Sequence, residues 1–195
     1  MSNRTYITRE EISRLLDVAK FSSDASRDCC MILLGYIHGL RVSELLDIKH
    51  SDIDLSGGTV YIRRLKNGLN TVHPLLNVEI EMLKRWYNDK GGGGDNNHVF
   101  VSKAGKKLTR QFFYKQIKKY GVRAKLSISV HPHMLRHGCG YELANQGLDT
   151  RLIQDYLGHK NIRHTVIYTA SNYKRFSRAW KKVDYEHANA IEISI

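Results

Sequence analysis

The stretch HPHMLRHGCGYELANQGLDTRLIQDYLGHKNIRHTVIYT (131–169) carries most of the signals that decide the fold. Its apolar residues recur at helical spacing, and Pro132 suits the first turn of a helix, where a backbone N–H is not needed. Gly158 is a typical helix terminator. The stretch and the residues after it predict helices at about 131–146, 149–157, 161–168 and, amphipathic and last, 171–184.

Helical patterns also precede this stretch. TREE (8–11) has the spacing of a capping box, so a helix is expected to begin there. The apolar run CCMILLGYI (29–37) predicts a buried helix with Gly39 as its terminator. Ser43 can cap a short helix and leave Arg41 just outside it. Two further helices are expected at about 77–88 and 109–120.

The hydrophobic period changes between these helices. TVYIRRL (59–65) and TVHPL (71–75) alternate apolar and polar residues, and KNGLN between them is a turn signal. The pattern predicts a β-hairpin over 59–75, with Lys66 at the start of its loop. HVFVS (98–102) is expected to be a third short strand.

The length of 195 residues fits one good-sized domain or two small ones. Gly91–Gly94 is the one linker-like segment, and it is expected to be a loop because the strands on both sides are too few to build separate cores. The whole chain, residues 1–195, is therefore expected to form a single α+β domain, mainly α with a small antiparallel β-sheet.

The charge points to a partner class. Thirty-one Lys and Arg against 19 Asp and Glu give a net charge of +12, which attracts polyanions. A membrane surface is disfavoured, because no segment outside the expected core helices combines a basic face with one rich in Trp, Phe and Leu. No apolar run approaches the roughly 18–20 residues that span a bilayer. Nucleic acid is the leading partner.

The N-terminal residues and the cysteines indicate the compartment. The chain begins with polar and charged residues and shows no secretory signal, so a cytoplasmic location is expected. Cys29 and Cys30 lie in an apolar run and Cys139 in a helical pattern. An odd number of cysteines without a framework spacing predicts reduced, structural thiols.

Polar residues from four separate parts of the sequence together suit phosphoryl transfer. Phosphoryl transfer needs positioned cations, and the planar fork of arginine binds two phosphate oxygens at once. Arg41 and Arg136 could hold one phosphate without a metal, while Lys66 could protonate the leaving alkoxide and Tyr168 could attack in line. His133 lies three residues before Arg136 and so shares its helix face.

RVSEL, the lysine in RRLKNG, HPHMLRHG, LGHKNIRHT and the tyrosine that follows resemble the catalytic domain of the tyrosine recombinases of the phage integrase family. The resemblance runs from about Thr8 to the C-terminus and implies that catalytic-domain architecture. Glu44 matches the acidic residue that supports the first arginine. The six catalytic positions of the family are matched, in order, by Arg41, Lys66, His133, Arg136, His159 and Tyr168.

The resemblance implies a role for each residue. Tyr168 would attack the scissile phosphate, release a 5′-hydroxyl and leave a 3′-phosphotyrosyl bond, while the two arginines hold the non-bridging oxygens. Lys66 would protonate the departing 5′-oxygen. His133 would act as acid/base partner of the tyrosine proton, and His159 would donate a hydrogen bond to the phosphate. No cofactor is implied.

Longer stretches are similar to the compact fimbrial phase-variation recombinases, which have no separate N-terminal DNA-clamping domain of roughly 100 residues. These stretches are RRLKNGLNTVHPL, HPHMLRHGCGYELANQG and DTRLIQDYLGHKNIRHTVIYTASN. The similarity implies a bacterial, nucleoid-associated enzyme that inverts a promoter-bearing DNA element controlling fimbrial expression. Its partners would be double-stranded DNA with inverted-repeat sites, three further copies in a homotetramer, and accessory DNA-bending proteins. The helix at 171–184 is a candidate for exchange between subunits, or a core helix of its own chain.

The sequence allows three other interpretations. The histidines invite a metal site, but no glutamate follows the first histidine of the His133–His137 pair as H-E-x-x-H requires, so none is expected. A type IB topoisomerase would use the same cutting and resealing chemistry without a specific site. A non-catalytic DNA-binding regulator would not be expected to retain all six polar residues.

Overall fold

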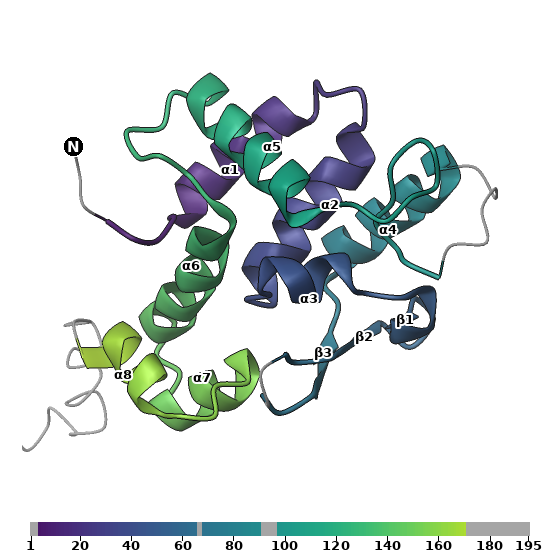
Figure 1. Ribbon diagram of the computed structural model, residues 1–195. Coiled ribbons are helices and arrows are strands. Elements are labelled where there is room, and N and C mark those ends of the chain that lie inside the picture. Colours follow the sequence, from purple (N-terminus) through teal and green to yellow (C-terminus); the bar gives the residue numbers. More distant parts are fainter. Residues whose placement is uncertain (1–3, 66–67, 91–96, 171–195) are drawn as a thin grey trace, which may run out of the picture.

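The computed structural model describes residues 4–65, 68–90 and 97–170, and the fold below is that of these residues. Figure 1 shows α6 leading from the main helical body to α7 and α8, with the small sheet beyond α3. The helices are α1 (Arg9–Ala19), α2 (Ala25–Ile37), α3 (Val42–Leu46), the 3₁₀ helix η1 (His50–Asp52), α4 (Asn77–Lys90), α5 (Arg110–Arg123), α6 (Pro132–Asn145), α7 (Thr150–Leu157) and α8 (Arg163–Ala170).

Local sequence signals explain where the helices begin and end. The predicted capping box before α1 is confirmed, since the Thr8 hydroxyl accepts the Glu11 N–H and the Glu11 carboxylate accepts the Thr8 N–H. Pro132 opens α6 as predicted. Gly39 follows α2 with φ +57°, a conformation that favours glycine, and Gly158 follows α7 with φ +65°.

The sheet contains the predicted hairpin. β2 (Thr59–Ile62) pairs antiparallel with β3 (Thr71–Pro74), in the register Thr59 opposite Pro74 and Ile62 opposite Thr71. β1 (Ile53–Asp54) pairs with the other edge of β2, so the order is β1-β2-β3. The mainly helical fold with a small antiparallel sheet is therefore confirmed.

The prediction of a third strand at 98–102 is wrong. Within the part of the chain that the structure describes, that segment makes only isolated bridges, from His98 to Lys49 and from Val101 to Lys107. Its apolar residues are buried in the core, and the Val99 carbonyl accepts the Trp86 indole N–H at 2.8 Å. An apolar run in a buried irregular segment resembles a strand in the sequence, because both place side chains in the core.

The core has two parts. The larger one surrounds α2, in which ten of 13 residues are buried, and includes side chains from α1, α3 to α6 and the sheet. The smaller one lies between α6, α7 and α8 and includes Cys139, Ile153, Leu157 and Tyr168. Because α6 contributes to both, it fixes the position of α8 relative to the main body.

Other predictions have mixed outcomes. The three cysteines are free and buried, as expected. No helix among the described residues is long and apolar enough to cross a membrane. The expected glycine loop at 91–94, Lys66 and the last helix at 171–184 lie outside the described residues.

Candidate active site

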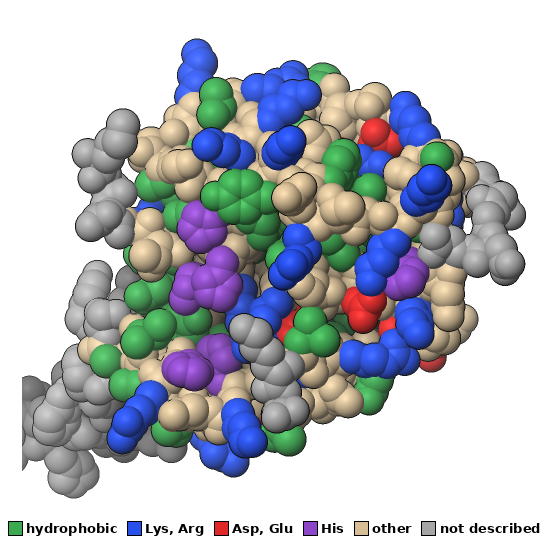
Figure 2. Space-filling view, viewed as in Figure 1, with side chains coloured by type: hydrophobic (Ala, Val, Ile, Leu, Met, Phe, Trp, Pro, Cys, Tyr) green, Lys and Arg blue, Asp and Glu red, His purple; other side chains and the backbone are tan. Residues whose placement is uncertain are grey.

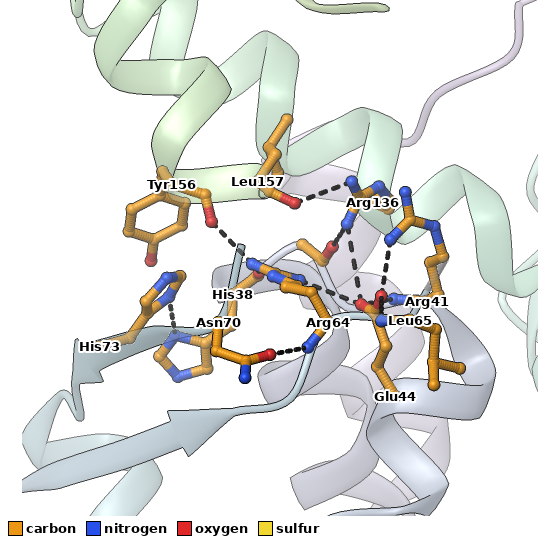
Figure 3. A network of polar contacts seen from close by, with 11 residues as sticks. His38, Arg41, Glu44, Arg64, Leu65, Asn70, His73, Arg136, Tyr156 and Leu157 are labelled. Atoms are coloured by element: carbon orange, nitrogen blue, oxygen red, sulfur yellow. Dashed lines mark hydrogen bonds and ion pairs between the residues drawn. The ribbon is translucent and has the colours of Figure 1, made fainter. Parts of the chain in front are cut away.

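Residues far apart in the sequence meet where the ends of α2 and α7 approach α3, α6 and the hairpin. Figure 2 shows histidine side chains gathered in a column on one face, with Lys and Arg side chains beside them. Figure 3 shows a polar network in which arginines from three segments converge on Glu44. The described candidate residues are Arg41, Glu44, His133, Arg136, His159 and Tyr168.

Glu44 is the centre of this network. Its two oxygens accept four N–H groups: the Arg41 Nη1 at 2.6 Å and backbone N at 3.0 Å, the Arg64 Nη1 at 3.0 Å and the Leu65 backbone N at 3.2 Å. Burial raises the pKa of this carboxyl, but the Arg41 hydrogen bonds and the charges of Arg64 and Arg41 outweigh burial and lower the pKa overall. Glu44 is therefore a buried carboxylate held by charged donors.

This geometry corrects one local expectation. Ser43 does not cap α3; Arg41 occupies the N-cap position, and its backbone N–H is bonded by the Glu44 side chain. The carboxylate three residues into the helix therefore takes the place of a serine hydroxyl at the helix start. The same arrangement turns the Arg41 side chain back onto Glu44.

Arg136 is held by hydrogen bonds to the ends of two helices. Its side chain is 2% exposed, and it donates from Nη1 to the Gly39 carbonyl at 2.6 Å and from Nη2 to the Leu157 carbonyl at 2.9 Å. These carbonyls lie at the C-terminal ends of α2 and α7, where the helix dipole favours a cation. Burial, followed by the charges of Arg41 and Arg64, lowers the pKa of Arg136 to about 10, so it remains charged at neutral pH.

Arg41 is the more accessible member of the predicted pair. Its side chain is 28% exposed and shares Glu44 with Arg136, whose Nη1 lies 3.9 Å from the carboxylate. Figure 3 shows the two guanidiniums side by side above Glu44. The structure thus brings together the two arginines that the sequence analysis paired, in an arrangement suited to one phosphate.

His159 follows α7 and is buried. Its Nδ1 lies 2.9 Å from the Thr165 hydroxyl, and its ring is nearly parallel to that of Tyr168, with 6.4 Å between centroids. Burial, then the charges of Arg136 and Arg41, lower the pKa of His159 to about 3. A neutral ring that accepts the Thr165 hydroxyl at Nδ1 carries its hydrogen on Nε2 and can donate it to a phosphate oxygen.

Tyr168 is buried on α8, with 1% of its surface exposed. Its hydroxyl lies 3.0 Å from the His137 Nδ1, and a Cβ on Gly140 would come within 2.6 Å of its ring. Burial raises the pKa of Tyr168 to about 12, an effect that the Arg136 charge partly offsets. The hydroxyl is therefore protonated at neutral pH and needs an acceptor for its proton.

His137 is the residue in contact with that hydroxyl, whereas the family resemblance implies His133 as the acid/base partner of the tyrosine proton. The His133 ring packs edge-on against His137, with 4.4 Å between centroids. Burial, then the His133 and Arg136 charges, lower the pKa of His137 to about 4, so its ring is neutral at neutral pH. In the tautomer that carries its hydrogen on Nε2, the Nδ1 accepts a hydrogen bond from the Tyr168 hydroxyl. The i, i+4 spacing of the two histidines is visible in the sequence, where it resembles a metal-binding pattern.

Arg64 is a second residue of the site that the sequence motifs do not single out. Val60, Ile62 and Arg64 are all buried, so Arg64 continues the inward-facing alternation of β2. A charged residue at an inward position is a signal that could have found it. The neighbouring Lys66, the predicted general acid, lies outside the described residues.

The described residues contain no group of three or more His, Cys, Asp or Glu side chains arranged to hold a metal ion. The candidate site is made of arginines, histidines and a tyrosine. They provide fixed positive charge, neutral hydrogen-bonding rings and a buried hydroxyl within one network. This combination is suited to metal-free phosphoryl transfer.

Comparison with known proteins identifies the class. Residues 5–175 match the phage integrase family, and the chain belongs to that family and is a tyrosine recombinase. It is 49% identical over 185 residues to the type 1 fimbriae regulatory protein FimE of Escherichia coli (strain K12), covering 93% of each chain. It is 48% identical over 190 residues to the type 1 fimbriae regulatory protein FimB of the same strain, covering 96% of this chain and 95% of that one.

Solved structures agree with the fold. The crystal structure of XerA recombinase superposes with a TM-score of 0.79 at 25% identity, covering 93% of this chain and 66% of XerA. A post-cleavage complex of the XerH site-specific recombinase with its palindromic difH substrate gives a TM-score of 0.76 at 26% identity, covering 91% of this chain and 52% of XerH. The predicted family and catalytic-domain architecture are confirmed.

Proposed function

We propose that this protein is a site-specific recombinase that cuts and rejoins DNA through a 3′-phosphotyrosyl bond to Tyr168, and thereby inverts a promoter-bearing element that controls fimbrial expression. The observation that carries this proposal is the pair Arg41 and Arg136, held together over the buried carboxylate of Glu44. Similarity to two fimbrial regulatory proteins along nearly their whole length supports the fimbrial target.

Cleavage begins with the Tyr168 hydroxyl. Its proton passes to the neutral Nδ1 of His137, against which His133 packs, and the phenolate oxygen attacks the scissile phosphate in line. Because Tyr168 is buried beside His137, DNA binding must bring the phosphate to it or release its ring toward the phosphate. The 5′-oxygen leaves opposite the attacking tyrosine, and Lys66 protonates it.

The charge that develops on the phosphate is stabilised by fixed donors. Arg41 and Arg136 bind the non-bridging oxygens, and the Nε2 hydrogen of His159 provides a further bond. Each such donor in a water-poor site contributes a factor of about 10²–10³ to the rate. The bond energy is retained in the phosphotyrosine, so attack by a 5′-hydroxyl rejoins a strand without ATP.

Exchange between two duplexes requires four active sites, so we infer a homotetramer on two inverted-repeat sites, with accessory DNA-bending proteins. The net charge of +12 favours binding to the DNA backbone in the bacterial nucleoid. The whole chain acts as one catalytic domain, and the segment 171–184 is the candidate for exchange between subunits. Inversion changes promoter orientation, which makes the recombinase a regulator of transcription.

The test is to express the protein in its host and sequence the genomic junctions that change. Inversion between two inverted repeats is expected with the wild-type chain and not with Tyr168→Phe. Relaxation of plasmids that lack such repeats, with no new junctions, would contradict site-specific recombination and indicate a topoisomerase.

A further inference from the structure

We propose that Arg64 is a positioning residue of the cleavage site, which sets Arg41 and Arg136 for the phosphate without touching it. This inference rests on the proposed function. Arg64 follows β2, and its side chain is fully buried. It donates from Nη1 to Glu44 at 3.0 Å, and from Nη2 to the Tyr156 carbonyl at 2.6 Å and the His38 carbonyl at 3.3 Å.

Arg64 and Arg136 form two successive links between the same pair of helix ends. Arg64 binds the His38 and Tyr156 carbonyls, and Arg136 binds the carbonyls of the next residues along, Gly39 and Leu157. Figure 3 shows both guanidiniums near Glu44, with the Tyr156 and Leu157 carbonyls on one side. The ends of α2 and α7 that hold Arg136 are therefore also held by Arg64.

The turn after α7 is shaped around the Arg64 side chain. Gly158 has φ +65°, and a Cβ there would lie 2.8 Å from the Arg64 Cγ and 2.9 Å from its Nε. The chain thus passes directly over the Arg64 stem on its way to His159. This close approach is independent of the hydrogen bonds and links Arg64 to the position of His159 as well.

Arg64 cannot bind the phosphate itself, because its side chain has no exposed surface and its two terminal nitrogens already bind Glu44 and two carbonyls. It acts through Glu44, which also fixes Arg41. A lysine would keep the charge, but its single ammonium cannot reproduce the planar fork that reaches three acceptors. Arg64→Lys therefore removes the hydrogen-bonding geometry of the guanidinium while it keeps the positive charge.

Arg63→Lys is the matched control. Arg63 is the preceding residue, its side chain is 46% exposed, and its Nη1 binds Asp52 at 2.6 Å. It belongs to a different ion pair from the Glu44 network. The substitution is chemically identical to Arg64→Lys, so any difference between the two variants comes from the position.

The experiment measures single-turnover cleavage by the full-length chain on two suicide DNA substrates. One has the natural scissile phosphate, and the other has a methylphosphonate, in which a methyl group replaces one charged oxygen. Arg64→Lys should slow cleavage of the phosphate substrate by at least about tenfold, since small misplacements in an active site have large effects on rate. DNA affinity should be unchanged, because phosphate contacts elsewhere dominate it.

On the methylphosphonate, the Arg64→Lys penalty should shrink several-fold, because the neutral group needs less from the two arginines. Arg63→Lys should cleave both substrates as the wild type does. Equal Arg64→Lys penalties on both substrates, or no penalty, would overturn the positioning role. If Arg64→Lys is unfolded, Arg64→Gln is used instead. The ratio of its cleavage-rate penalties on the phosphate and methylphosphonate substrates then tests the positioning role in the same way.

The two proposals fail in different ways. If the wild-type chain forms no adduct that depends on Tyr168, the proposed function fails and the role of Arg64 fails with it. If the wild-type adduct forms and the two Arg64→Lys penalties are equal, only the positioning role fails.

Discussion

Replacing Glu44 with glutamine is the most informative test of how the site is held together. The two carboxylate oxygens accept four N–H groups from Arg41, Arg64 and Leu65. Glutamine offers one acceptor oxygen and an NH₂ group that would face these donors. At least one buried donor then loses its partner, and the fully buried guanidinium of Arg64 loses its counter-charge.

The size of the effect follows from that burial. Removing one partner of a buried ion pair costs about 3–5 kcal/mol, because an uncompensated charge remains inside. For a domain of this size each kcal/mol lowers the melting temperature by about 2–4 °C, so Glu44→Gln should melt roughly 6–20 °C below the wild type. That is a large fraction of the stability of an ordinary domain.

Urea unfolding of the two proteins measures the difference. Glu81→Gln is the control, because Glu81 is 62% exposed and pairs with Lys84 on the surface of α4, so its loss should cost at most about 0.5 kcal/mol. The pKa of Glu44 is below its usual 4.5 in the folded protein. The stability that the Glu44 carboxylate contributes is thus fully present above pH 4.5 and is lost as the pH falls through its pKa in the folded protein.

The difference in the free energy of unfolding between the wild type and Glu44→Gln should therefore become smaller in acid. A surface ion pair within one helix contributes at most about 0.5 kcal/mol. If the free energy of unfolding of Glu44→Gln at neutral pH lies within about that amount of the wild-type value, Glu44 is not the charged centre of the network.

Three further predictions concern the tyrosine and the buried histidines. His137→Ala should slow adduct formation about 10²-fold with DNA affinity unchanged, because the Tyr168 proton loses its acceptor; adduct formation at the wild-type rate would remove His137 from the mechanism. Gly140→Ala places a methyl carbon 2.6 Å from the Tyr168 ring, so it should abolish cleavage while the protein still binds DNA in a gel-shift assay. Cleavage at the wild-type rate would contradict the close packing of Gly140 against Tyr168. Burial lowers the pKa of His73 from 6.5 to about 3, so wild-type stability should fall as the pH drops from 6.5 toward 3, and His73→Gln should show a shallower loss in urea titrations; parallel curves would argue against it.

Much of the fold was predictable because its signals are local. The capping box at Thr8, the proline that opens α6 and the alternation of β2 and β3 each determine structure within a few residues. The third strand failed because an apolar run at 98–102 does not reveal whether its backbone pairs with a strand or with Ile48 and Trp86. That choice is made by tertiary packing.

The sequence nominates the candidate residues of the site, but it does not indicate the contacts between them. Spacing placed His133 and Arg136 on one helix face, whereas the choice of His137 as the contact of Tyr168 depends on how α8 packs against α6. Arg64 carries no motif, and its role follows only from the meeting of two helix ends. Such long-range carbonyl contacts leave little trace in a single sequence.

The central claim is that Tyr168 forms a covalent bond to DNA. The direct measurement is to incubate the protein with a suicide DNA substrate that carries a recombination site, denature the mixture, and map any protein-bound nucleotide by mass spectrometry. We expect a denaturation-resistant adduct on Tyr168 with the wild type, and none with Tyr168→Phe despite equal DNA binding. An adduct that persists in Tyr168→Phe, or that maps to another residue, would contradict the account.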